Sequence, residues 1–112
     1  MLATHGVQRC RSMRESKVEA HLVKMVELTD GIIRKVQWIG RRGAPDRWCG
    51  WPQTDQVIGR SAWVELKKPT TPHAAAHQAR EHARLRACGE QVYVLATIEE
   101  IDRFIHSMTG LG

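Results

Sequence analysis

This 112-residue sequence has few aromatic residues and no long apolar segment. Aromatic residues make up 5% of the chain, with four Trp, one Tyr and one Phe. No apolar run approaches the roughly 20 residues that a membrane-spanning helix requires. Residues 1–11 also contain no apolar stretch of signal-peptide length. We therefore expect neither membrane insertion nor secretion, and we place the protein in the cytoplasm, that of a host cell if a phage encodes it.

Cysteine is also scarce. Cys10, Cys49 and Cys88 form an odd, widely spaced set, which matches neither a disulfide framework nor the short ligand spacing of a zinc site. The six histidines have no cysteines at matching spacing, so zinc is not favoured. Reduced thiols in a cytoplasmic protein are the expected state.

Acidic residues are outnumbered by basic ones. Twelve Asp and Glu stand against seventeen Lys and Arg, which leaves a formal net charge of +5. Such a balance favours an anionic partner, nucleic acid first, although many basic domains bind none. Hydrophobic residues make up 42% of the chain, enough for the core of one domain.

The hydrophobic periodicity predicts an α/β protein. Residues 1–11 lack periodicity and are expected to form a loose basic arm, followed by a single domain over residues 12–112. Glycine and proline divide that domain into helix, three strands, helix, strand and helix. The predicted elements are residues 12–29, 32–39, 46–50, 62–67, 72–88, 91–96 and 98–106. The second helix should connect the third and fourth strands as a crossover, and the apolar fourth strand should lie inside the sheet.

Two acidic residues on neighbouring predicted strands indicate hydrolytic chemistry. Glu65 and Lys67 alternate onto one face of a strand, about 7 Å apart, and Asp46 begins the strand before it. If these strands pair, Asp46 and Glu65 can converge on one Mg²⁺ or Mn²⁺ ion, since two carboxylates with open positions suit a hard cation. Lys67 could then orient a water or neutralise phosphate charge. The alternative is an ordinary solvated pair of Glu65 and Lys67 on a sheet surface.

Polar residues on the apolar stripes of two predicted helices are further candidates. Glu19 lies on the stripe of the first helix, where it is either a capping-box residue with Ser16 or a metal ligand. Glu15 fits a capping box with Ser12. Gln78 lies on the inner stripe of the second helix, where its amide could bind a metal-bound water, the backbone near Glu65 or a neighbouring loop.

The residues together resemble the VRR-NUC (virus-type replication-repair nuclease) domain, a branch of the PD-(D/E)xK nuclease superfamily. The resemblance extends over nearly the whole chain, from Arg14 to Ile105. The matching residues are VEAHL (18–22), GRRGAPDR (40–47), WVELKKP (63–69), Gln78 and LRACG (85–89).

The resemblance implies a restriction-endonuclease-like core with a small mixed sheet flanked by helices. It also implies that Glu19, Asp46 and Glu65, with the carbonyl of Leu66, surround the metal, and that Lys67 and Gln78 complete the site. Free-standing members of this size resemble phage or prophage proteins that form homodimers and cut branched DNA, such as four-way junctions or flaps. We therefore expect a Mg²⁺- or Mn²⁺-dependent endonuclease. The alternative is a non-catalytic DNA-binding or architectural module that retains a nuclease fold.

Basic and aromatic residues near the predicted site suggest how DNA would bind. The expected phosphate contacts are Lys35, Arg41, Arg42 and Arg47; the alternative is a solvated basic loop. Trp38 and Trp63 are more typical of a core, whereas Trp51, in a predicted loop, is the better candidate for stacking on a base. The chain departs from the family pattern at residues 29–31, at Trp48 and Trp51, and in a longer loop over residues 52–60, which affects the expected substrate more than the acidic cluster.

Overall fold

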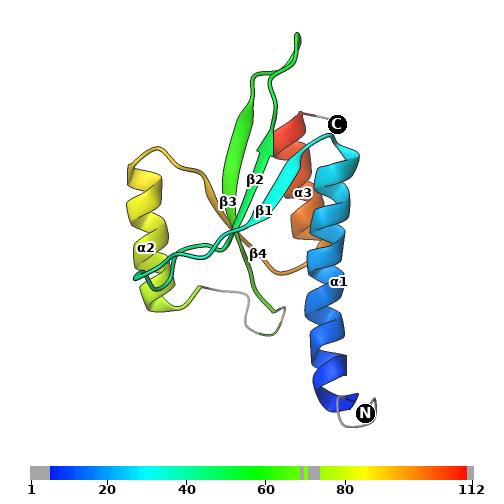
Figure 1. Cartoon of the computed structure of the whole chain (residues 1–112), viewed down its shortest axis with the longest axis vertical. Helices are drawn as coiled ribbons and strands as arrows, with labels where there is room; N and C mark the ends of the chain where they lie inside the picture. Colours follow the sequence, from blue (N-terminus) through cyan, green and yellow to red (C-terminus); the bar gives the residue numbers. More distant parts are fainter. Residues whose placement is uncertain (1–5, 69, 71–73, 111–112) are drawn as a thin grey trace.

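The helices and strands follow one another in the order predicted from the sequence. The computed structural model describes residues 6–68, 70 and 74–110. Within them the elements are α1 (Gly6–Leu28), β1 (Ile32–Lys35), β2 (Arg47–Trp51), β3 (Arg60–Leu66), α2 (Ala76–Ala87), β4 (Val92–Leu95) and α3 (Ile98–Thr109). Figure 1 shows the sheet between α2 on one side and α1 with α3 on the other. The predicted α/β architecture is confirmed.

The four strands form one mixed sheet in the order β1-β2-β3-β4. β1 pairs with β2 and β2 with β3 in antiparallel fashion, whereas β3 and β4 are parallel. Parallel neighbours need a crossover connection, and α2 supplies it as predicted. The prediction that the last strand is internal was wrong, because β4 lies at the sheet edge. Its apolar residues are instead covered by α2 and α3, which both contact it.

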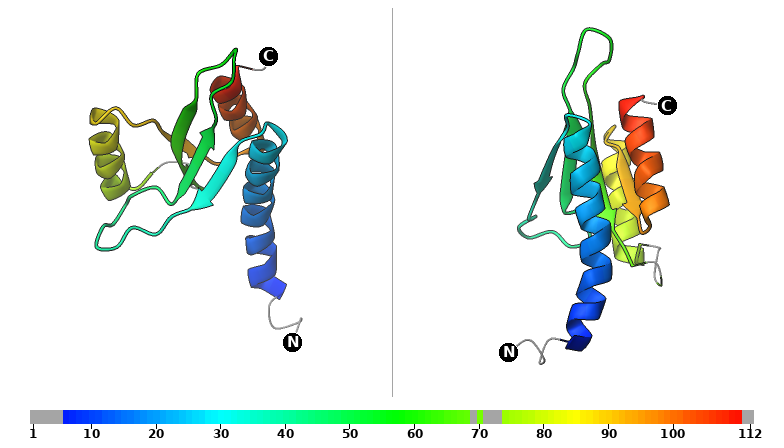
Figure 2. Two further views of the ribbon diagram at one scale, coloured as in Figure 1. Left: turned by 45° about the horizontal axis from the view of Figure 1, so that its top comes forward. Right: turned by 90° about the vertical axis from the view of Figure 1, so that its right-hand side faces the viewer.

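The apolar core lies on the face of the sheet covered by α1 and α3 (Figure 2, right). These two helices contact each other, and Ile101, Phe104 and Ile105 of α3 are buried. The cluster comprises Leu22, Val26, Cys49, Trp51, Ala62, Val64, Leu95, Ile101, Phe104, Ile105 and Met108. Side chains from α1, α3 and the sheet therefore exclude water from this face.

Trp51 belongs to this core and not to an exposed loop. It ends β2, is 8% exposed and packs against Phe104 with ring centroids 5.8 Å apart. Its indole nitrogen donates to the hydroxyl of Thr29 at 2.9 Å. The suggestion that Trp51 stacks on a base is wrong, because the hairpin begins one residue later and the ring is used for packing.

The ends of the helices differ from their predicted positions. α1 begins at Gly6 instead of Ser12, so residues 6–11, expected in a loose arm, are helical. Both predicted capping boxes, at Ser12 and at Ser16, fall inside this helix. α2 begins at Ala76; the predicted cap at Thr71 and Pro72 lies outside the described residues. Among the described residues, no helix is both long and apolar enough to cross a membrane.

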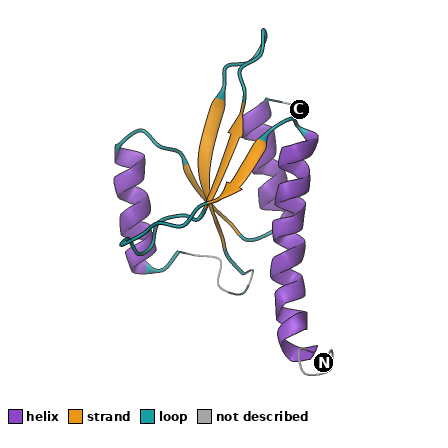
Figure 3. Ribbon diagram, in the orientation of Figure 1, coloured by secondary structure: helices purple, strands orange, loops and turns teal. Residues whose placement is uncertain are grey.

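The connection between β1 and β2 runs from the sheet to α2, as the teal segment in Figure 3 shows. Gly43 makes this approach possible, with a φ of +82°. A Cβ atom added there would lie 2.9 Å from the backbone oxygen of His77. Glycine is thus required at this position by both its conformation and its neighbour. The connection leads back into β2 beside α2, which places Asp46 at the edge of the candidate site.

Candidate active site

Asp46, which immediately precedes β2, lies beside Glu65 of the paired strand β3. Arg47 is opposite Val64 in the antiparallel register of β2 and β3, so continuing that register by one residue puts Asp46 opposite Glu65. Desolvation raises the pKa of Glu65, and the negative charge of Asp46 raises it further. The predicted strand pairing therefore brings these two carboxylates together on the α2 side of the sheet.

Lys67 and Gln78 form the second part of the site. The Lys67 ammonium donates to the Gln78 side-chain oxygen at 2.5 Å, and the same oxygen accepts from the backbone N–H of Ala75 at 3.0 Å. The backbone N–H of Lys67 donates a hydrogen bond to the carbonyl of Leu95. The charge of Lys67 also lowers the pKa of Glu65, against the effects that raise it. Gln78 thus ties the ammonium group to the start of α2.

Glu19 reaches this region from α1 through the guanidinium group of Arg47. Arg47 Nε donates to Glu19 Oε2 at 3.0 Å, and Nη2 donates to the same oxygen. Arg47 Nη1 donates to Asp46 Oδ1 at 2.7 Å. The hydrogen bond from Arg47 lowers the pKa of Glu19, and the charges of Arg47 and Lys35 lower it further. One guanidinium group therefore bridges carboxylates from α1 and from the start of β2.

The three predicted acidic residues are linked, but they do not surround one point. Across the described residues, no group of three or more Asp, Glu, His or Cys side chains is placed to hold a metal ion. Asp46 and Glu65 are adjacent, whereas the guanidinium of Arg47 lies between Asp46 and Glu19. The structure thus contains a carboxylate pair and a third carboxylate that is joined to it through a cation.

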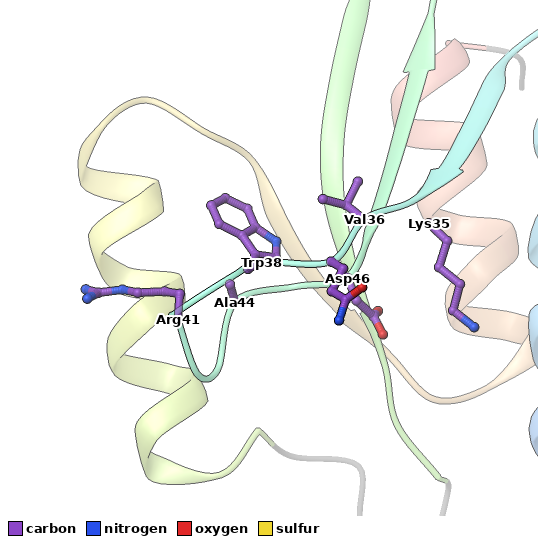
Figure 4. Close-up of a pocket in the computed structure, with 7 residues that line it drawn as sticks. Lys35, Val36, Trp38, Arg41, Ala44 and Asp46 are labelled. Carbon is purple, nitrogen blue, oxygen red and sulfur yellow. The ribbon is translucent and has the colours of Figure 1, made fainter.

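A hollow of about 490 Å³ opens beside Asp46 (Figure 4). It is lined by Lys35, Val36, Gln37, Trp38, Arg41, Ala44 and Asp46. The indole nitrogen of Trp38 donates to the carbonyl of Pro45 at 2.7 Å, and its ring lies 5.1 Å from that of Trp63. Both rings are half-buried. They pack on each other and lie outside the apolar core cluster, so they are not the core residues that the sequence suggested.

The four predicted phosphate contacts are not equivalent. Lys35, Arg41 and Arg42 are exposed, although Arg41 also donates to Glu81 at 3.2 Å. In Figure 4 Lys35 and Arg41 lie at opposite ends of the hollow, with Arg41 extending across α2. The side chain of Arg47 is only 13% exposed. Three of the cations are therefore accessible to a phosphate in this arrangement, and the fourth is engaged with carboxylates.

Two buried polar residues of α2, Glu81 and His82, were not among the site residues predicted from the sequence. Glu81 is buried and binds Arg41 and Arg84, and the hydrogen bond from Arg41 lowers its pKa. His82 is 1% exposed, and its Nε2 has no hydrogen-bond partner within the part of the chain that the structure describes. The spacing of Glu81 and Arg84 indicates a local helix pair, but no sequence signal indicates the partner Arg41, which is 40 residues away.

No family model matches the sequence. The chain is 44% identical over 88 residues to "Putative nuclease p44" of Acyrthosiphon pisum secondary endosymbiont phage 1, and the match covers 76% of this chain and 85% of that protein. It also resembles a solved structure described as "VRR_NUC domain", with a TM-score of 0.73 and 32% identity over 83% of this chain and 95% of that one.

Proposed function

The chain belongs to the VRR-NUC family of nucleases, and on that premise we propose that it is a metal-dependent endonuclease that hydrolyses phosphodiester bonds in DNA. The observation that supports this best is the placement of Asp46 opposite Glu65, with Lys67 following on the same strand face. Paired carboxylates beside an ammonium group suit a phosphate-cleaving site.

The carboxylate pair of Asp46 and Glu65 suits a divalent cation. Burial and the neighbouring charge of Asp46 raise the pKa of Glu65, which means that the two carboxylates repel each other and that a cation between them would relieve the repulsion. Carboxylate and carbonyl oxygens are ligands that Mg²⁺ and Mn²⁺ accept. Asp46, Glu65 and the carbonyl of Leu66 would hold the ion, with Glu19 supporting it or a second ion. A metal held there would supply charge stabilisation for the phosphodiester and would lower the pKa of a water.

Lys67 orients the attacking water and neutralises charge on the phosphate. Its ammonium group is held by the Gln78 side chain at 2.5 Å, which restricts the positions that it can occupy. The Gln78 side chain is itself held by the hydrogen bond that it accepts from the N–H of Ala75, the N-cap residue of α2. A group that is already oriented need not be reorganised during the reaction, which makes it more effective electrostatically.

The exposed cations beside the hollow hold the DNA backbone. Lys35, Arg41 and Arg42 are accessible, and the net charge of +5 adds a general attraction for DNA. Contacts of this kind are made to phosphates and do not read the base sequence. We therefore expect strongly salt-dependent binding and selectivity for DNA shape, with four-way junctions or flaps as substrates and a symmetric homodimer as the acting unit.

A cleavage assay on a panel of labelled DNAs tests the function. Linear duplex, single strand, flap and four-way junction are incubated with Mg²⁺, with Mn²⁺ or with chelator. We expect cleavage that requires the metal and that is fastest on branched DNA. A mobility shift without metal-dependent cutting would favour a non-catalytic DNA-binding module, whereas equal cutting of all substrates would contradict only the structure selectivity.

The metal site is tested by calorimetric titration with Mn²⁺. We expect binding to the wild-type protein that is lost in Asp46→Asn, because the amide has no charge to offer the ion. Asp55→Asn, on the exposed loop between β2 and β3, is the matched control and should bind like wild type. Unchanged affinity in Asp46→Asn would remove Asp46 from the metal ligands.

A further inference from the structure

Arg47 occupies an unusual position for a residue beside a proposed cation site. It begins β2 and lies on the sheet face that carries the apolar core, opposite Val64. Its guanidinium donates three hydrogen bonds to two carboxylates, two to Glu19 Oε2 and one to Asp46 Oδ1. The side chain is 13% exposed, whereas those of Glu19 and Asp46 are 39% and 46% exposed. The cation is thus the most buried member of the cluster.

Those bonds use oxygens of Glu19 and Asp46, two of the three carboxylates to which a metal role has been assigned. A divalent cation and a guanidinium cannot occupy the same lone pairs at the same distance. The burial of Arg47 also strengthens its ion pairs with the carboxylates, because a partly desolvated ion pair is screened less by water and salt than an exposed one. Desolvation lowers the pKa of Arg47, but its hydrogen bonds to Glu19 and Asp46 and the charges of these carboxylates together raise it.

We propose that Arg47 is a built-in counter-cation that holds the carboxylates of Glu19 and Asp46 in the metal-free protein and that a divalent ion must displace in order to bind. This inference rests on the proposed function, since it concerns the same site. Arg47 offsets the repulsion between the negative charges of Glu19 and Asp46 when no metal is bound. It therefore competes with an incoming metal ion for their carboxylate oxygens. It is a positioning residue, and its direct effect is on the affinity for the ion.

Competition and a purely structural role make opposite predictions. If Arg47 only ties α1 to β2, removing it disorders Glu19 and leaves metal affinity equal or weaker. If Arg47 competes for the carboxylate oxygens, its removal strengthens metal binding even though the protein loses an ion-pair network. Metal affinity therefore distinguishes the two roles independently of DNA cleavage.

The test is a calorimetric titration with Mn²⁺ of the full chain as wild type, Arg47→Gln and Lys35→Gln. Lys35 is the matched control because it acts on Glu19 through charge alone, so its substitution removes the same charge without opening the carboxylates. We expect the dissociation constant to fall about tenfold or more in Arg47→Gln, the effect of one charged pair of roughly 1.4 kcal/mol. In Lys35→Gln we expect a fall of less than about threefold. Equal effects of the two substitutions, or affinity in Arg47→Gln no greater than in wild type, would overturn the proposal.

A second measurement uses the unaltered protein and does not depend on the folding of a variant. The side-chain Nε–H resonance of Arg47 is followed by nuclear magnetic resonance while Mg²⁺ is added. Displacement predicts that this resonance shifts and exchanges faster with water as the site fills. A resonance that stays unchanged while Mg²⁺ binds would overturn the inference and leave the metal site standing. If neither wild type nor Arg47→Gln binds Mg²⁺ or Mn²⁺, the proposed metal site itself is wrong, and the inference falls with it.

Discussion

The two faces of the sheet differ sharply although the same strands supply both. On the face towards α1 and α3, Ala62 and Val64 are buried in an apolar cluster. On the face towards α2, the intervening residues Trp63 and Glu65 are half-buried, and the buried residues of α2 itself are Glu81 and His82. Strand alternation separates the two sets. One face is thus suited to stability, whereas the other keeps polar groups at the boundary with water, where a substrate can reach them.

The energetics of the two faces should differ accordingly. Burial of apolar side chains among α1, α3 and the sheet contributes most of the favourable free energy of folding. The α2 face gains less, because Glu81 and Lys67 must be desolvated and are compensated by Arg41, Arg84 and Gln78. Substitutions on the first face should therefore change stability, and substitutions on the second should change activity.

The largest effect should come from Phe104→Ala on the apolar face. Phe104 is 3% exposed and contacts the rings of Trp51 and Tyr93. We expect the free energy of unfolding to fall by about 3–5 kcal/mol, since a large cavity is left in the core. Urea denaturation measures it, with Ile39→Ala, whose side chain is 96% exposed, as a control that should change stability by less than about 0.5 kcal/mol. A decrease of less than about 1 kcal/mol in the free energy of unfolding of Phe104→Ala would contradict the view that the apolar face contributes most of the stability.

Lys67→Ala is the corresponding test on the other face. We expect DNA cleavage to fall at least about a hundredfold, with the fold and DNA binding nearly intact, because the ammonium acts on the reaction and not on the core. Initial rates, circular dichroism and a binding titration measure the three quantities. Lys24→Ala, on the exposed side of α1, should cleave like wild type. Turnover in Lys67→Ala above about a hundredth of the wild-type rate would contradict the assigned role.

Gly31→Ala examines how tightly the apolar face is packed. A Cβ atom at Gly31 would lie 2.6 Å from the indole nitrogen of Trp51 and 2.9 Å from Val26. We expect a loss of about 1–3 kcal/mol in the free energy of unfolding, as for other overpacked cores. In a Trp51→Phe background the same substitution should cost less, because the smaller ring leaves room, and a double-mutant cycle gives the coupling. Additive effects would show that the close contact is not the cause.

The smallest expected effect is the contribution of His82 to the pH dependence of stability. Desolvation, followed by the charges of Arg86 and Lys67, lowers its pKa from the usual 6.5. Its contribution to stability is therefore present above about pH 6.5 and is lost as the pH falls towards the lower pKa of the folded state, because the unfolded chain takes up the proton first. Between pH 7 and pH 5, we expect the stability of His82→Gln to decline less steeply than that of wild type, by at most about 1.4 kcal/mol per pH unit. Parallel curves for the two proteins would contradict this assignment.

Local patterns in the sequence were sufficient to predict the elements and much of the site. Apolar periodicity predicted the three helices, and the segment Pro45-Asp46 with Glu65 and Lys67 predicted a carboxylate pair beside an ammonium group. The pairing of β2 with β3 and the bond between Lys67 and Gln78 agree with these predictions. The catalytic and metal roles of the same residues stay predictions.

Other features could not be read from local patterns. Trp51 was assigned to a loop because Pro, Asp and Gly follow it closely, yet strand pairing with Arg60 and the contact with Phe104 place it in the core. The edge position of β4 depends on which strand it pairs with and on the covering by α2 and α3. Such properties depend on contacts between residues far apart in the chain, which no short window of sequence contains.

From the order of its residues alone, this chain determines which segments become helices or strands and which side chains share a face of a strand, because both follow from steric and apolar preferences over a few neighbouring positions. Only the folded arrangement decides that Arg47 stands between Glu19 and Asp46, since these groups come from α1 and β2 and meet only when both elements pack. Electrostatic interactions depend on separation in space and on burial, and separation along the chain determines neither.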